Sequence, residues 1–169
     1  MIETLPAGAV LVTQQSAPLR DIMRDMLKYS TNLTAEMAGL AATMARGGKP
    51  DTLKASAAEM NRWAKGALGM RNPGLVDHSG LGDDSRVSVR DMLSALIKVN
   101  GSGVLKPILK TITMRDAKRN LLPNHPIKVV AKTGTLNFVS TLAGYMTGPN
   151  GREMAFAIFC ADEPRRATI

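Results

Sequence analysis

Two hydrophobic periodicities divide this chain. From about residue 16 to 121, apolar residues recur three or four positions apart, which is the spacing of helices that bury one face. From about 127 to 161, apolar and polar residues follow the two-residue alternation of strands. The pattern predicts an α+β fold, in which a helical block is followed by an antiparallel β-meander with the helices on one face of the sheet.

The first two helices are separated by a short polar link. An apolar stripe begins at Leu19, just after Pro18, and is interrupted at Tyr29-Ser30-Thr31-Asn32. Small polar residues bond to nearby backbone groups and favour helix ends over helix interiors. The stripe resumes at Leu33 and ends at Gly47-Gly48, a good C-terminal stop. We therefore expect helix, link and helix, with the link facing whatever both helices pack against.

Two further helices carry capping signals. Asp51 or Thr52 caps a helix that runs to about Ala67. Ser88, with Asp91 three residues later, resembles a capping box and opens a helix that closes near residue 100.

Other short elements are also expected. Residues 104–112 suggest one more helix, in which Pro107 is tolerated only in the first turn. The turn-rich segment 73–84 has room for a two- or three-residue strand at Leu75, and residues 9–12 form an apolar run that fits a strand.

Three strands are expected after Pro126, at about 127–133, 137–147 and 153–161. Thr147-Gly148-Pro149-Asn150-Gly151 joins the last two and is a strong hairpin signal.

Composition indicates one domain over residues 1–169, long enough to bury a core without disulfides or metals. Aromatic residues are only 4% while Met counts 11, so the core must rely on aliphatic side chains and methionine. We expect Trp63, the methionines at helical spacing and Cys160 to lie in this core. A single cysteine excludes an internal disulfide.

The net charge of +8 and the pI near 10 permit an anionic partner. The basic residues are scattered along the chain, however, and aromatic side chains are too few to stack on bases. The pattern thus favours a solvated basic surface over a nucleic-acid binder. No apolar run approaches the ~18 residues of a membrane-spanning helix, and residues 1–6 show no signal-peptide pattern.

Candidate chemistry gathers where the first predicted strand ends. Ile127 to Ala131 form an apolar run, and Lys132-Thr133-Gly134-Thr135 follow it at once. Two hydroxyls and one positive charge converge there, and Gly134 leaves room for a close approach of a ligand or another backbone. Such a pocket suits a carboxylate. A surface strand with a solvated lysine is the alternative that this stretch alone leaves open.

A second motif lies about a hundred residues upstream. Ser30-Thr31-Asn32 together with Lys132-Thr133-Gly134-Thr135 resembles the second and third motifs of the penicillin-binding proteins and serine β-lactamases. The wider resemblance is to D-alanyl-D-alanine carboxypeptidases/endopeptidases, the low-molecular-weight penicillin-binding proteins with inserted domains, and it spans Ala9 to Cys160. The further matching stretches are Ser16-Ala17-Pro18-Leu19, Met26-Leu27-Lys28-Tyr29, Asp77-His78-Ser79-Gly80-Leu81 and Leu142-Ala143-Gly144-Tyr145.

The resemblance implies a role for each motif residue in forming an acyl-enzyme on a peptidoglycan stem peptide. Ser30 would relay a proton to the leaving amine. Asn32 would bind a substrate amide and help to hold the catalytic lysine. Lys132 would polarise Ser30 and attract the terminal carboxylate, which the Thr133 and Thr135 hydroxyls would bind. The Thr135 N–H would be an oxyanion donor, and Gly134 would keep the strand edge open for the substrate.

One part of the family's pattern is missing. No serine in the sequence has a lysine three positions later, so the Ser-x-x-Lys nucleophile motif is absent. We expect the chain to be the C-terminal part of one transpeptidase-like domain, inactive in isolation. The resemblance also implies an extracytoplasmic or periplasmic location, β-lactams and the upstream part of the same domain as partners, and no cofactor or metal. A truncated sheet would expose an edge that invites dimerisation.

Two other interpretations remain at this point. The chain could be a non-catalytic module that binds cell-wall peptides or a partner chain along its strand edge. Asp77, His78 and Ser79 could also be taken for a serine triad, although sequence neighbours rarely reach that geometry. We expect His78 to be a solvent-facing loop residue and His125 to be structural.

Overall fold

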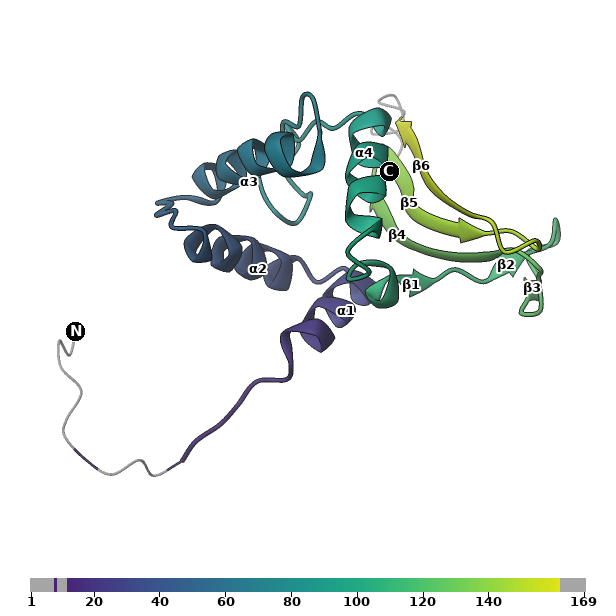
Figure 1. Cartoon of the computed structure of the whole chain (residues 1–169), viewed down its shortest axis with the longest axis horizontal. Coiled ribbons are helices and arrows are strands. Elements are labelled where there is room, and N and C mark those ends of the chain that lie inside the picture. The colour runs from purple at the N-terminus through teal and green to yellow at the C-terminus, as the bar shows by residue number, and fades with distance from the viewer. Residues whose placement is uncertain (1–7, 9–11, 162–169) are drawn as a thin grey trace.

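The computed structural model describes residue 8 and residues 12–161. The last long helix packs against a curved antiparallel sheet, and the two helices before it lie farther from the sheet (Figure 1). Four predicted helices are confirmed: α1 Leu19–Tyr29, α2 Asn32–Ala45, α3 Leu53–Leu68 and α4 Val89–Asn100. The strand expected at 9–12 falls mainly on residues outside the described part. No described helix is long and apolar enough to cross a membrane.

The sheet has four strands in the order β1-β4-β5-β6. The expected meander is confirmed as β4 Lys128–Leu136, β5 Val139–Thr147 and β6 Glu153–Ala161. The fourth strand, β1 Lys110–Thr111, pairs antiparallel with the other side of β4. A separate two-stranded ribbon pairs β2 Met114–Arg115 with β3 Leu121–Leu122.

The helix expected at 104–112 is wrong. The chain forms only a single 3₁₀ turn, η1 Lys106–Ile108, and then becomes extended in β1. Pro107 lacks an N–H, and the β-branched residues that follow fit a strand better than a helix. Pairing with β4 decides the outcome: Thr111 faces Val130, and the N–H of Ile112 donates to the Val129 carbonyl at 2.9 Å.

Both predicted helix caps are present. The Thr52 hydroxyl accepts the Ala55 N–H at 3.1 Å, and the Ser88 hydroxyl accepts the Asp91 N–H at 3.0 Å. The Asp91 side chain does not complete a capping box. Its buried carboxylate accepts the N–H of Arg71 at 2.7 Å and of Asn72 at 3.2 Å, tying α4 to the segment after α3. The Arg71 N–H is the main reason that the pKa of Asp91 is lowered.

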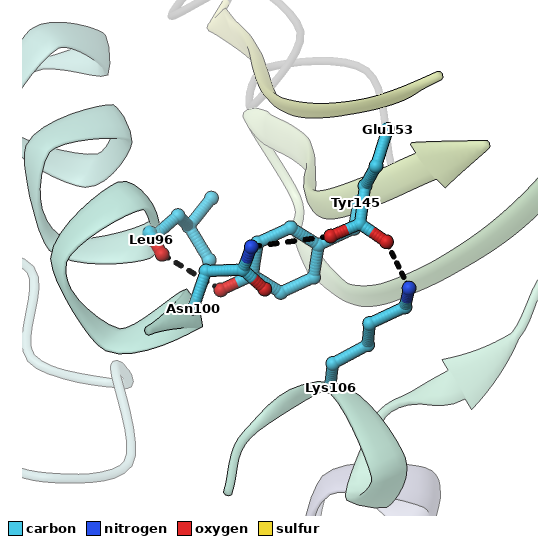
Figure 2. Close-up of polar contacts among 5 residues, drawn as sticks. All are labelled: Leu96, Asn100, Lys106, Tyr145 and Glu153. Atoms are coloured by element: carbon cyan, nitrogen blue, oxygen red, sulfur yellow. Dashed lines mark hydrogen bonds and ion pairs between the residues drawn. The ribbon is translucent and has the colours of Figure 1, made fainter. Parts of the chain in front are cut away.

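A polar joint fixes α4 and η1 against the sheet (Figure 2). The Tyr145 side chain is 1% exposed, and its hydroxyl donates to the Leu96 carbonyl at 2.8 Å. The Glu153 carboxylate accepts the Asn100 side-chain amide at 3.1 Å and forms an ion pair with Lys106. Therefore α4, η1, β5 and β6 meet next to the turn that joins β5 to β6.

The expected core is only partly correct. Trp63 is 37% exposed and lies beneath the Arg46 guanidinium, and Cys160 is exposed. Met37 and Met44 are 60% and 65% exposed, because the apolar stripe of α2 extends beyond the surface that α3 contacts. Helical spacing shows which residues share a face, but not whether another element covers that face.

Candidate active site

Ser30 and Lys132 meet at the junction of the helical block and the sheet. Ser30 follows the last residue of α1, and Lys132 lies in the middle of β4. The Lys132 ammonium donates to the Ser30 hydroxyl at 2.5 Å and also to the Thr133 carbonyl. The two polar clusters that the sequence placed a hundred residues apart therefore share one site.

The backbone at Ser30 is in the left-handed region, with φ 55° and ψ 50°. Only Ser30 and Thr31 separate α1 from α2, so the chain must reverse within two residues. The N–H groups of both residues bond back to the Met26 carbonyl. A residue with a Cβ costs about 1–2 kcal/mol in this conformation. A serine in this conformation, where glycine is favoured, marks Ser30 as a candidate functional residue.

The register of the sheet aims Lys132 at the helices. Val130 faces Tyr145 across β4 and β5, and Lys132 faces Ala143, two residues further along both strands. Side chains two residues apart lie on the same face of a sheet. Because Tyr145 points to α4, Lys132 points to the same side, where the α1–α2 link lies.

The electrostatic environment of Lys132 favours an anion. Partial burial lowers the pKa of its ammonium, and repulsion from Lys110 lowers it further. Lys132 forms no ion pair with any described residue. A half-buried cation without an acidic partner attracts a negatively charged ligand.

Part of β4 has an open edge beside this cation. Only Lys110 and Thr111 of β1 pair with β4, and within the described residues no strand continues that pairing along 132–136. The Val129 carbonyl points to the β1 side, because it accepts the Ile112 N–H. Backbone groups of alternate residues point to the same edge, so those of Thr133 and Thr135 also point outwards. The Thr133 carbonyl accepts from Lys132, so the Thr133 N–H and both backbone groups of Thr135 remain as partners for an extended ligand.

Gly134 has a packing role that the sequence did not predict. A Cβ at this position would collide with the hydroxyl of Thr141 on β5. That hydroxyl lies 3.5 Å from the Gly134 carbonyl, to which it donates. Because Gly134 has no side chain, β4 and β5 pack closely at this point. Its small size also leaves the helix-facing side of β4 open.

Asn32 lies at the start of α2, two residues from Ser30, and is exposed. Its side chain makes no hydrogen bond to another described residue. The structure thus brings Ser30, Lys132 and Thr133 into contact and leaves the Asn32 amide free at the rim of the site.

Glu36 is a site-flanking residue that the sequence analysis missed. It lies four residues after Asn32, on the same face of α2. Its carboxylate accepts the N–H groups of His78 at 3.2 Å and of Ser79 at 2.9 Å, holding the 77–82 loop against α2. Burial works to raise the pKa of Glu36, but the bonds from Ser79 and His78 together outweigh it and lower the pKa. An acidic residue inside an apolar stripe was the available signal.

His78 does not face solvent, so that expectation was wrong. Its Nε2 lies 2.8 Å from the Ser56 hydroxyl, which lies 2.8 Å from the Thr43 hydroxyl. The ring packs so closely on Gly39 of α2 that a Cβ there would collide with it. Its Nδ1 is buried and has no hydrogen-bond partner among the described residues.

The triad interpretation of this loop also fails. The His78 ring bonds to Ser56 instead of Ser79, and the Asp77 carboxylate accepts the N–H groups of Gly80 and Gly82. Hydrogen bonds from Glu36 on α2 and Ser56 on α3 therefore hold this loop in place.

Comparisons with known proteins show the family to which the chain belongs. The sequence profile of the D-Ala-D-Ala carboxypeptidase 3 (S13) family matches residues 2–168. The chain belongs to this family. Membership confirms the resemblance to D-alanyl-D-alanine carboxypeptidases that the sequence analysis drew.

Two relatives of the S13 chain have similar sequences. A carboxypeptidase of Mycobacterium tuberculosis is 29% identical over 170 residues, which cover 92% of this chain and 36% of the relative. The D-alanyl-D-alanine carboxypeptidase DacB of Haemophilus influenzae is 29% identical over 160 residues, covering 90% and 33%. The chain therefore spans about a third of the length of these relatives.

Solved structures confirm the α+β fold. The crystal structure of penicillin binding protein 4 (dacB) from Haemophilus influenzae superimposes with a TM-score of 0.71 at 27% identity, covering 85% of this chain and 34% of that chain. The same protein complexed with a β-lactam gives a TM-score of 0.70 at 28% identity, covering 85% and 35%. A predatory endopeptidase from Bdellovibrio bacteriovorus, with a TM-score of 0.61 at 23% identity over 90% of this chain and 39% of that one, shares the fold.

Proposed function

We propose that this chain forms the Ser-x-Asn and Lys-Thr-Gly half of the active site of a serine-type D-Ala-D-Ala carboxypeptidase/endopeptidase that acts on peptidoglycan stem peptides. The observation that carries the proposal is the contact of the Lys132 ammonium with the Ser30 hydroxyl. In this proposal, residues 1–169 are the C-terminal part of one transpeptidase-like domain.

In this proposal Ser30 transfers a proton and Lys132 supplies a positive charge. A serine nucleophile attacks the carbonyl between two D-alanines, and its proton passes to the nitrogen of the leaving D-alanine as the C–N bond breaks. Ser30 relays that proton, and Lys132 polarises the Ser30 hydroxyl. Water then attacks the acyl ester and releases the shortened peptide and the free serine. The lowered pKa of Lys132, caused by burial and then by Lys110, supports this role.

The open edge of β4 binds and orients the substrate. An extended peptide pairs with the outward backbone groups of Thr133 and Thr135, as an added strand does. The Thr135 N–H is an oxyanion donor, the two threonine hydroxyls hold the terminal carboxylate, and the free amide of Asn32 binds a peptide group. Gly134 has no side chain, so it leaves the helix-facing side of β4 open to the substrate.

The nucleophile comes from polypeptide outside these 169 residues, because none of the serines within them belongs to a Ser-x-x-Lys motif. The chain alone is then not acylated by β-lactams. The substrate class implies an extracytoplasmic location.

A fluorescent penicillin tests the proposal. We expect covalent labelling of a longer protein that adds a Ser-x-x-Lys segment to these residues, and none of the 169-residue chain. In the longer protein, Lys132→Met should slow acylation by about 10²-fold. Labelling of the 169 residues alone, or an unchanged rate in the variant, would overturn the proposal. Binding of stem peptide by the longer protein without acylation would instead support a non-catalytic module.

A further inference from the structure

Lys110 lies where the open edge of β4 begins. It is the first residue of β1 and is paired in register with Ala131. Directly opposed residues lie on the same face of the sheet, and Thr133 follows Ala131 by two positions on that face. Thr133 is therefore the diagonal neighbour of Lys110, at the roughly 7–8 Å that a long side chain can span.

The positive charge of Lys110 is not neutralised within the described structure. Its side chain is exposed, and the ion pairs among described residues join Arg24 to Asp21, Arg62 to Glu59 and Lys106 to Glu153. Its repulsion adds to the effect of burial on Lys132, so the two ammonium groups act on each other. By the register, Lys110 lies on the Ala131 and Thr133 face of the sheet and Lys132 on the helix-facing side, so an anion at the strand edge is near both cations and relieves their repulsion.

Lys132 also has limited donor capacity left. An ammonium group has three N–H donors, and two of them are used by the Ser30 hydroxyl and the Thr133 carbonyl. A carboxylate accepts hydrogen bonds on two oxygens, so a single remaining donor leaves one oxygen free for another cation. Lys110 is the exposed lysine placed next to Thr133 by the strand register.

We propose that Lys110 is a second cation for the carboxylate of a peptide bound along Thr133–Thr135, and that it favours peptides with a free C-terminal carboxylate over peptides whose terminus is an amide. The inference rests on the proposed function and deepens it, because a free carboxylate marks a carboxypeptidase substrate and an amide marks an endopeptidase substrate. The effect of an exposed charge of this kind is modest and weakens with salt.

Ligand binding to the 169-residue chain tests this inference. Heteronuclear NMR titrations measure the affinity for N-acetyl-D-Ala-D-Ala and for its C-terminal amide, in the native chain and in Lys110→Met. Lys128→Met is the matched control, because Lys128 is another exposed lysine of the sheet, about 13 Å from Lys132 along β4. Lys110→Arg keeps the charge and should rescue binding, and circular dichroism verifies that each variant is folded.

We expect Lys110→Met to weaken binding of the carboxylate ligand about two- to fivefold and to leave binding of the amide unchanged, with the difference shrinking in 1 M salt. Lys128→Met should change neither. Equal weakening of both ligands, or no change, would overturn the role of Lys110. If the native chain itself shows no preference for the carboxylate, the proposed carboxylate site fails too. A preference that Lys132→Met removes and Lys110→Met retains would refute the inference on Lys110 alone.

Discussion

The Lys132 ammonium lies 2.5 Å from the Ser30 hydroxyl, although the two residues are 102 positions apart in the sequence. Two features create this contact: the left-handed turn at Ser30, which is local, and the register of β4, which its neighbouring strands set. A one-residue slip of β4 would exchange the faces of its side chains and turn Lys132 away from the helices. The contact is therefore as sensitive to the pairing of the sheet as to the side chains themselves.

The strain at Ser30 predicts a conflict between stability and chemistry. Ser30→Gly and Ser30→Ala both remove the hydroxyl, but only glycine adopts φ 55° without a steric cost. We expect the glycine variant to be more stable than the alanine variant by about 1 kcal/mol. Urea unfolding of the two variants measures the difference. Equal stability would mean that the backbone at this position is not strained.

The Glu36 clamp predicts a pH-dependent contribution to stability. Because the pKa of Glu36 in the folded chain lies below its ordinary value of 4.5, its contribution is full above that value and is lost as the pH falls through the folded pKa. We expect Glu36→Gln to lower the free energy of unfolding by about 1 kcal/mol at pH 7, a figure reduced for the partial exposure of this carboxylate.

Denaturant unfolding at several pH values tests the clamp, and the difference in unfolding free energy between native chain and variant should shrink as the pH falls below 4.5. Amide exchange of His78 and Ser79 should also speed up in the variant. Glu59→Gln is the control, because Glu59 forms an exposed ion pair with Arg62 on α3. A gap that stays constant with pH would show that the charge of Glu36 does not hold the loop.

The hydroxyl of Tyr145 should contribute measurably to the joint between α4 and the sheet. Tyr145→Phe removes the buried bond from the tyrosine hydroxyl to the Leu96 carbonyl. We expect a loss of about 1 kcal/mol, equivalent to roughly 2–4 °C in Tm by calorimetry. Tyr29→Phe, at the other tyrosine of the chain, is exposed and should change Tm little. Similar shifts for both variants would argue against a specific role for the joint.

The two glycines of the central strands should respond differently to alanine. A Cβ at Gly144 would meet the Val130 carbonyl and lie 2.6 Å from the Ala131 Cα, and backbone atoms cannot move aside. We expect Gly144→Ala to cost about 3 kcal/mol. A Cβ at Gly134 meets mainly the Thr141 hydroxyl. Gly134→Ala should cost about 1 kcal/mol, and Thr141→Ala should relieve most of that cost.

The Gly134→Ala/Thr141→Ala pair also separates packing from function. If Gly134 admits substrate, the stable double variant in the longer protein should still react slowly with fluorescent penicillin. Native labelling rates in the double variant would assign Gly134 to packing alone.

Removal of Lys110 should be detectable at Lys132. Burial is the larger cause of the lowered Lys132 pKa and is retained in Lys110→Met, but the repulsion is removed. We expect the Lys132 pKa to rise, as followed by an NMR titration of its side chain, and to stay unchanged in Lys128→Met. A Lys132 pKa that does not move would show that the two ammonium groups are too far apart to share a ligand.

Local patterns predicted much of this fold because their causes are local. Polar residues at 29–32 end one helix and begin the next, Thr52 and Ser88 cap helices with their own hydroxyls, and the turn at 147–151 closes a hairpin. Each of these depends on neighbours within a few positions. The helix expected around Pro107 failed because pairing with a distant strand outweighed a short helical pattern.

The sequence by itself determined the two periodicities, the helix ends, the strand meander and the two motifs that mark the candidate site. Only the tertiary structure decided that Lys132 faces Ser30, that Glu36 and Ser56 hold the His78 loop, that Lys110 stands beside Thr133, and that Trp63 lies at the surface. The physical reason is the distance along the chain over which each interaction acts. Caps and turns are fixed by interactions within a few residues, whereas burial and long-range contact depend on which distant surface a side chain meets.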